Sequence, residues 1–86
     1  MVSQLFEEKA AAINKVTTAP TQDEMLQLYG LYKQATVGDN TKEKPGIFNM
    51  KDRYKWDAWE KLKGKSPAEA EQEYIALVDA LLAKYA

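Results

Sequence analysis

Apolar residues recur along the C-terminal part of the chain at the spacing of an α-helix. Most stand three or four positions apart, which places them on one face of a helix: Ala70, Tyr74, Leu77, Val78, Leu81 and Tyr85. Ser66, Pro67 and Glu69 precede this pattern as a capping box with proline at the first helical position. The pattern therefore predicts a helix from about Pro67 to about Lys84.

Three shorter segments upstream also show helical patterns. The first follows Ser3, a good N-cap, and carries its apolar stripe at Phe6, Ala10 and Ile13. The second follows a T-x-x-E capping box at residues 21–24, and the third follows Asn49, which we expect to be its N-cap. Helices are thus predicted over about 3–15, 22–35, 50–62 and 67–84, and the fold class is all-α.

Residues 37–48 separate the second and third predicted helices. Glycine, aspartate, asparagine and proline in this segment are typical of loops, and a loop this long is often functional. An extended chain rises about 3.3 Å per residue, so the loop can run the length of a helix and let the third helix lie parallel to the second. We expect the apolar loop residues Ile47 and Phe48 to fill the core, together with Trp56 and Trp59 of the third helix.

The composition argues against several classes of protein. The 86 residues contain no cysteine and no histidine, so disulfides, thiolate metal sites and the usual general base of hydrolases are not available. The net charge of −1 argues against nucleic-acid binding. The sequence shows no membrane-spanning segment and no secretory signal. We expect a monomeric, cytoplasmic protein without catalytic activity, cofactor, metal or stable membrane insertion.

One helix face combines aromatic and basic side chains. Tyr29, Tyr32 and Lys33 stand at positions i, i+3 and i+4, so two phenols and one ammonium group share a face. Such a face can offer hydrogen bonds and a positive charge to a phosphate group. Tyrosines at this spacing more often pack in a core, however, and surface lysines such as Lys51 and Lys55 more often face water. The pattern alone leaves both roles open.

Four blocks of the sequence, in order, resemble the acyl-CoA-binding protein (diazepam-binding inhibitor) family. They read Y-G-L-Y-K-Q-A-T-V-G-D-N at 29–40, K-P-G-I-F-N-M-K at 44–51, K-W-D-A-W at 55–59 and E-Y-I at 73–75. The resemblance covers nearly all of the chain and implies one acyl-CoA-binding domain over residues 1–86. It implies a four-helix up-down-down-up bundle with a long crossover loop between the second and third helices. The implied function is that of a carrier and pool former for long-chain acyl-CoA in lipid metabolism, with transient contact to enzymes that use this ligand.

The resemblance also implies where the head of the ligand binds. Tyr29, Lys33 and Lys55 would surround the 3′-phosphate of the adenosine, and Tyr32 and Tyr74 would line the path of the nucleotide and pantetheine. The full set of expected contact residues is Asn14, Met25, Leu26, Tyr29, Gly30, Leu31, Tyr32, Lys33, Lys51, Lys55 and Tyr74.

The acyl chain would lie between the second and third helices, with Met25 and Leu26 as walls. Lys51 would add a basic contact near the head group. The sequence departs from the family pattern at Asn14 and Ala19, where lysine is common in relatives. We therefore expect fewer positive charges at the rim of the site.

Two other functions remain as alternatives. The first is a helical interaction module that docks a partner protein through its aromatic face. The second, an enzyme or an accessory domain of one, is disfavoured because histidine and cysteine are missing.

Overall fold

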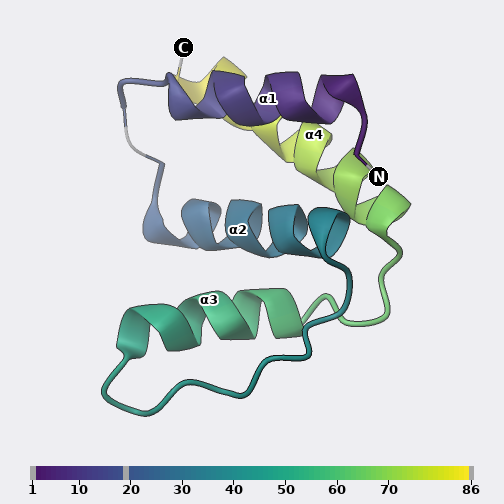
Figure 1. Ribbon diagram of the computed structural model, residues 1–86. Helices are drawn as coiled ribbons and strands as arrows, with labels where there is room; N and C mark the ends of the chain where they lie inside the picture. Colours follow the sequence, from purple (N-terminus) through teal and green to yellow (C-terminus); the bar gives the residue numbers. More distant parts are fainter. Residues whose placement is uncertain (1, 19, 86) are drawn as a thin grey trace.

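The computed structural model describes residues 2–18 and 20–85, and within these ranges it contains four α-helices and no strand (Figure 1). The helices are α1 (Gln4–Asn14), α2 (Gln22–Thr36), α3 (Met50–Glu60) and α4 (Pro67–Tyr85). The predicted all-α class is confirmed, and the helix ends lie close to their predicted positions.

Side-chain caps explain where three of the helices begin. The hydroxyls of Ser3 and Ser66 each accept a hydrogen bond from the backbone N–H three residues later, at 3.2 and 3.1 Å. Thr21 and Glu24 form the reciprocal capping box at the start of α2, with bonds of 3.1 and 2.9 Å. Asn49 is the N-cap of α3, as predicted, but its side chain makes no capping hydrogen bond.

The helices follow the up-down-down-up order. α2 and α3 run in the same direction because the crossover returns along their length, and α1 and α4 run in the opposite direction (Figure 1). Within the described ranges, α4 packs against both α1 and α2, whereas α3 packs against α2 alone. The bundle is therefore an open row in the order α1, α4, α2, α3, and the Cα trace measures 36 × 28 × 15 Å. Such a row leaves hollows beside α2 that a closed bundle would fill.

The main core lies between α1, α2 and α4. Its buried apolar side chains come from all three helices: Phe6, Ile13, Leu31, Ala35, Ala70, Tyr74, Val78 and Leu81. Trp59 is buried as predicted, but Trp56 is only partly buried. The indole N–H of Trp56 donates a hydrogen bond to the carbonyl of Lys42 at 2.8 Å, so this ring holds the crossover rather than the core.

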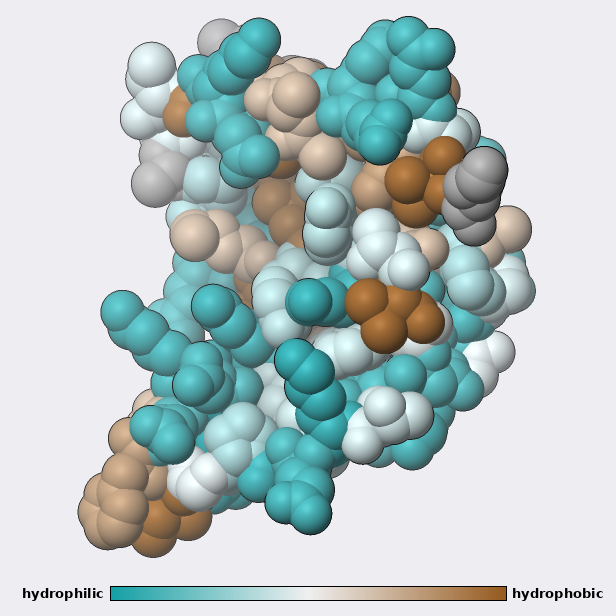
Figure 2. All heavy atoms as spheres, in the orientation of Figure 1, coloured by the Kyte–Doolittle hydropathy of each residue, from teal (hydrophilic) through white to brown (hydrophobic). Residues whose placement is uncertain are grey.

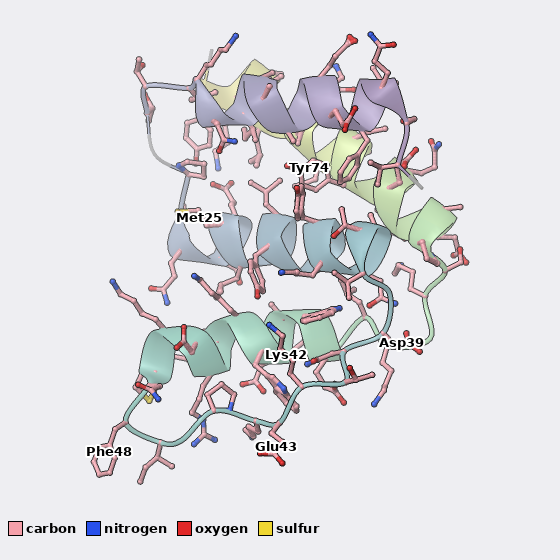
Figure 3. All side chains as sticks on the ribbon, viewed as in Figure 1. Met25, Asp39, Lys42, Glu43, Phe48 and Tyr74 are labelled. Atoms are coloured by element: carbon pink, nitrogen blue, oxygen red, sulfur yellow. The ribbon has the colours of Figure 1, made fainter. Side chains whose placement is uncertain are left out.

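The first half of the crossover loop is fixed to α3. The indole N–H of Trp59 donates to the carbonyl of Gly38 at 2.7 Å, which adds a second bond to the one from Trp56. The expectation that Ile47 and Phe48 fill the core is wrong, since they are 66% and 94% exposed. Figure 3 shows Phe48 at the outer end of the loop, pointing away from the helices.

A network of polar residues at the start of the crossover escaped the sequence prediction. The buried amide of Gln34 donates to Asp39 Oδ1 at 2.9 Å and to the carbonyl of Lys65 at 2.7 Å. Asp39 Oδ1 also accepts the backbone N–H of Gly64 at 2.9 Å, and Gly64 has a left-handed conformation, with φ of 93°. The bonds from Gly64 and then Gln34 lower the pKa of Asp39. The carboxylate thereby joins the end of α2 to the loop between α3 and α4.

Glu24 joins the start of α2 to the end of α4. Its carboxylate accepts hydrogen bonds from Lys84 Nζ at 2.8 Å, from the Tyr85 hydroxyl at 2.6 Å and from the Thr21 N–H at 2.9 Å. The bond from Lys84 lowers the pKa of Glu24 most, followed by the bonds from Tyr85 and Thr21. The pKa falls from 4.5 to about 2. Since folding favours the ionised form, Glu24 contributes stability that is fully present above pH 4.5 and is lost as the pH falls through about 2.

We predict that Glu24→Gln lowers the melting temperature at neutral pH and that this deficit shrinks in acid. Once Glu24 is protonated, at a pH below its pKa of about 2, both side chains are uncharged and the advantage of the carboxylate is gone. Thermal unfolding followed by circular dichroism between neutral and strongly acidic pH measures the difference. Glu8→Gln, at an exposed position on α1, is the matched control. A deficit that is independent of pH would contradict this role of Glu24.

Candidate functional site

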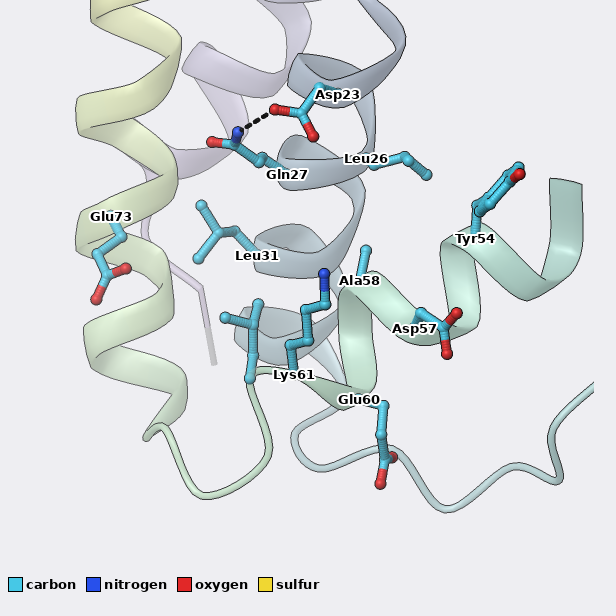
Figure 4. Close-up of a pocket in the computed structure, with 11 residues that line it drawn as sticks. Asp23, Leu26, Gln27, Leu31, Tyr54, Asp57, Ala58, Glu60, Lys61 and Glu73 are labelled. Carbon is cyan, nitrogen blue, oxygen red and sulfur yellow. Dashed lines mark hydrogen bonds between the residues drawn. The ribbon is translucent and has the colours of Figure 1, made fainter.

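Two hollows adjoin α2. The α2–α3 cleft has a volume of ≈ 630 Å³ and is lined by α2, α3, the residues directly after α3 and Glu73 of α4 (Figure 4). The α1–α2 groove has a volume of ≈ 370 Å³ and is lined by α1, α2, Pro20 and Tyr74 of α4. Both volumes fall within the range of roughly 300–1,000 Å³ that is typical of small-molecule sites.

Aromatic rings form much of the α1–α2 groove. Tyr29, Tyr32 and Tyr74 line it, and the buried ring of Phe6 supports two of them, with centroid distances of 5.5 Å to Tyr32 and 4.7 Å to Tyr74. Tyr74 is only 4% exposed, and burial, followed by the nearby Tyr32, raises the pKa of its phenol. The phenol therefore stays protonated at neutral pH and can donate a hydrogen bond, while the rings offer a stacking surface to a flat ligand.

Two ammonium groups from different helices converge on one of these rings. Lys55 Nζ of α3 lies 5.5 Å from the centroid of Tyr29, and Lys33 Nζ of α2 lies 6.0 Å from it. Lys33 Nζ also lies 5.7 Å from the ring of Trp59. Both amines therefore sit over aromatic faces, which is the geometry of cation–π contacts. The structure thus brings together the three residues predicted to surround a phosphate.

Carboxylates are distributed unequally between the two hollows. The lining of the α2–α3 cleft includes four acidic side chains: Asp23, Asp57, Glu60 and Glu73. The lining of the α1–α2 groove includes none. An anionic group is consequently favoured at the groove, next to Lys33 and Lys55, and repelled from the rim of the cleft.

Met25 and Leu26 do not share a hollow. Met25 lines the α1–α2 groove and Leu26 lines the α2–α3 cleft, because consecutive residues of an α-helix point about 100° apart. Figures 3 and 4 show Met25 near the start of α2 and Leu26 in the cleft. The two predicted wall residues thus belong to different parts of the surface, and only Leu26 lies between α2 and α3.

The remaining predicted site residues have varied positions. Leu31 is buried and lines the cleft, and Asn14 is exposed and lines the groove. Gly30 is buried where α2 crosses α3, and a Cβ there would lie 2.6 Å from the carbonyl oxygen of Ala58. Gly30 therefore permits the close approach of the two helices. Lys51 is exposed on the first turn of α3 and lines neither hollow.

Several residues that line the hollows were not predicted as site residues. In the groove these are Ala10, Ile13, Pro20 and Leu28, and in the cleft they include Tyr54, Ala58 and Leu62. Ala10 and Ile13 belong to the predicted apolar stripe of α1, and they lie one turn and one residue before Asn14, so the sequence pattern could have identified them. The departure noted at Ala19 lies outside the described residues.

The described part of the chain has no cluster of three metal-binding side chains of the His, Cys, Asp or Glu type. Within the same ranges, each helix is too short or too polar to cross a lipid bilayer. The aromatic groove, the two lysines over Tyr29 and the apolar wall of the cleft together fit a ligand that combines an aromatic anionic head with an apolar part.

Comparison with known proteins agrees with this geometry. Residues 3–78 match the family model described as acyl CoA binding protein. The acyl-CoA-binding protein of Saccharomyces cerevisiae is 76% identical over 85 residues, which cover 99% of this chain and 98% of the relative, and a Drosophila melanogaster homolog is 52% identical over the full length of both.

Solved structures give the same result. The crystal structure of Oryza sativa acyl-CoA-binding protein 2 superposes with a TM-score of 0.90 at 51% identity, covering 94% of this chain and 90% of the rice protein. The solution structure of the yeast acyl coenzyme A binding protein superposes with a TM-score of 0.78 at 76% identity, covering 98% of each chain. The chain therefore belongs to the acyl-CoA-binding protein family.

Proposed function

We propose that this chain binds long-chain acyl-CoA thioesters and acts as an acyl-CoA carrier and pool former. The observation that carries the proposal is the convergence of Lys33 and Lys55 on the ring of Tyr29, at the edge of an aromatic groove without carboxylates. We further propose that it does so as a cytoplasmic monomer that holds its ligand without chemical conversion. A chain without histidine and cysteine lacks the usual groups for cleaving a thioester.

The head of the ligand is assigned to the α1–α2 groove and its rim. Lys33 and Lys55 supply two positive charges for the 3′-phosphate, and the hydroxyl of Tyr29 adds a hydrogen-bond donor. The rings of Tyr32 and Tyr74 supply a surface for the adenine and the pantetheine path. Lys51, one turn before Lys55 on α3, adds longer-range attraction to the several negative charges of CoA.

The acyl chain is assigned to the α2–α3 cleft. Leu26, Leu31 and Ala58 form an apolar part of its wall, whereas the acidic side chains stand around them (Figure 4). An alkyl chain carries no charge, so these carboxylates do not repel it, whereas they would repel a phosphate. The charge distribution thus supports one orientation of the ligand over the reverse.

We predict that Lys33→Ala and Lys55→Ala each weaken palmitoyl-CoA binding by roughly tenfold or more, since each removes a charge-assisted contact worth about 1.5–3 kcal/mol. Lys63→Ala is the matched control, because Lys63 is an exposed lysine whose only ion pair in the described ranges is a 3.5 Å contact with Glu60. Isothermal titration calorimetry gives the affinities.

Repeating these titrations with palmitoyl-3′-dephospho-CoA locates the contact. The loss caused by either substitution should shrink when the 3′-phosphate is missing from the ligand. Wild-type protein that binds both ligands equally well would overturn the phosphate assignment, and wild-type protein that binds neither would overturn the proposed function.

A further inference from the structure

The outer end of the crossover carries an exposed apolar patch, here called the crossover tip and formed by Ile47, Phe48 and Met50. Their side chains are exposed to 66%, 94% and 50%. Figure 2 shows this patch as a brown protrusion at the lower left, in the place where Figure 3 labels Phe48. Because the ligand hollows are lined by other residues, the tip is not part of the site described above.

The tip is held in place by hydrogen bonds. A turn closed by the Asn49 N–H and the Gly46 carbonyl, at 3.0 Å, has Ile47 and Phe48 as its two central residues. Behind the turn, the crossover is fixed to α3 by the indole bonds of Trp56 and Trp59. The phenyl ring is therefore displayed at the end of an anchored loop and points away from the helices (Figure 3).

Positive charge surrounds the tip. Residues 42–55 contain five basic and two acidic side chains, a net charge of +3 in a chain whose total is −1. Within the described residues, none of the five basic side chains forms an ion pair: Lys42, Lys44, Lys51, Arg53 and Lys55. The segment thus pairs a protruding apolar group with cations, of which Lys42, Lys44 and Arg53 are not assigned to the ligand head and can meet an anionic surface.

We propose that the crossover tip docks the protein reversibly on membranes that contain anionic lipids. Phe48 and Ile47 would enter the headgroup–acyl boundary, and the surrounding lysines and arginine would contact lipid phosphates and carboxylates. A bilayer fits better than a partner protein because the patch is small and convex, whereas a stable protein interface needs a larger complementary surface. Lipid can take up a single protruding ring without such a surface.

Docking at this place would bring a ligand hollow close to the bilayer. Met50 and Tyr54 stand one turn apart on the same face of α3, and Tyr54 lines the α2–α3 cleft. The tip therefore continues along α3 toward the cleft. After docking, an acyl chain could pass between the bilayer and the cleft, and this second step rests on the proposed function. The docking itself does not rest on that function, and the docking is tested on ligand-free protein.

The test measures co-sedimentation of the full chain with vesicles of phosphatidylcholine, with or without phosphatidylserine. We expect binding to the mixed vesicles that falls with added salt, and a loss of about tenfold or more in Phe48→Ser, because the apolar ring is removed. Val37→Ser is the matched control, since Val37 is a 61% exposed apolar residue elsewhere on the crossover. The double variant Lys42→Gln, Lys44→Gln should bind the mixed vesicles more weakly than wild type. Its behaviour toward vesicles of phosphatidylcholine alone should equal that of wild type.

A second readout locates the tip at the bilayer. Because the chain has no cysteine, Phe48→Cys and Val37→Cys each accept one environment-sensitive fluorophore. The label at position 48 should shift to the blue on mixed vesicles, and the label at position 37 should not. Equal binding by wild type and Phe48→Ser would overturn the proposal. Absence of vesicle binding by wild type would also overturn it and would leave a protein partner as the occupant of the tip. Palmitoyl-CoA affinity is measured in parallel, so failure of docking and failure of the proposed function are separate results.

Discussion

Replacing Phe6 by alanine is expected to lower the free energy of unfolding by about 3–5 kcal/mol. The ring is 1% exposed and lies between α1 and the tyrosines of α2 and α4, at 5.5 Å from Tyr32 and 4.7 Å from Tyr74. Domains of this size are stabilised by only roughly 5–15 kcal/mol in total, so the loss is a large part of the whole. The melting temperature should fall by roughly 15–30 °C.

Leu5→Ala is the matched control for this substitution. Leu5 precedes Phe6 on α1 but is 50% exposed, so its truncation should change the stability by less than about 1 kcal/mol. Urea unfolding followed by circular dichroism measures both variants. Because Phe6 supports two tyrosines of the α1–α2 groove, Phe6→Ala should also weaken acyl-CoA binding at a temperature where it is folded. Similar stability of the two variants would show that α1 contributes little to the core.

Local signals explain why the helices were predictable from the sequence. Ser3, the pair Thr21 and Glu24, and Ser66 mark helix starts through bonds that span only three residues, so the sequence contains both partners of each bond. The length of the loop allowed a parallel course of α2 and α3, and the family resemblance implied it. The convergence of Lys33 and Lys55 on Tyr29 required the family resemblance as well, because it depends on two helices that the loop separates.

The predictions that failed depend on contacts between distant segments. An apolar residue in a loop is buried only if the loop passes over the core, and the indole bonds from Trp56 and Trp59 hold the crossover along α3 instead. Ile47 and Phe48 consequently point into solvent. The role of Asp39 was missed for the same reason, since one of its partners, Gly64, lies 25 residues away.

The separation of Met25 from Leu26 gives the second large prediction, which concerns the length of the acyl chain. If the tail enters the α2–α3 cleft, affinity should rise with each methylene by up to about 0.8 kcal/mol until the cleft is full. Palmitoyl-CoA should then bind up to roughly 4 × 10⁴-fold more tightly than octanoyl-CoA, and free CoA should bind most weakly of the three. Free palmitate should bind weakly too, because it lacks the head that contacts Lys33 and Lys55. Titration calorimetry across the series measures the slope.

Two neighbouring substitutions identify which hollow holds the tail. Leu26→Ser places a hydroxyl in the wall of the cleft and should flatten the dependence on chain length, with little effect on free CoA. Met25→Ser alters the groove and should weaken every CoA ligand by a similar factor, which leaves the slope unchanged. The reverse pattern would place the tail in the α1–α2 groove and the head elsewhere. With the tail in the groove, the ligand phosphates would lie nearer the carboxylates of the cleft and be repelled by them. The charge distribution therefore favours the orientation with the tail in the α2–α3 cleft.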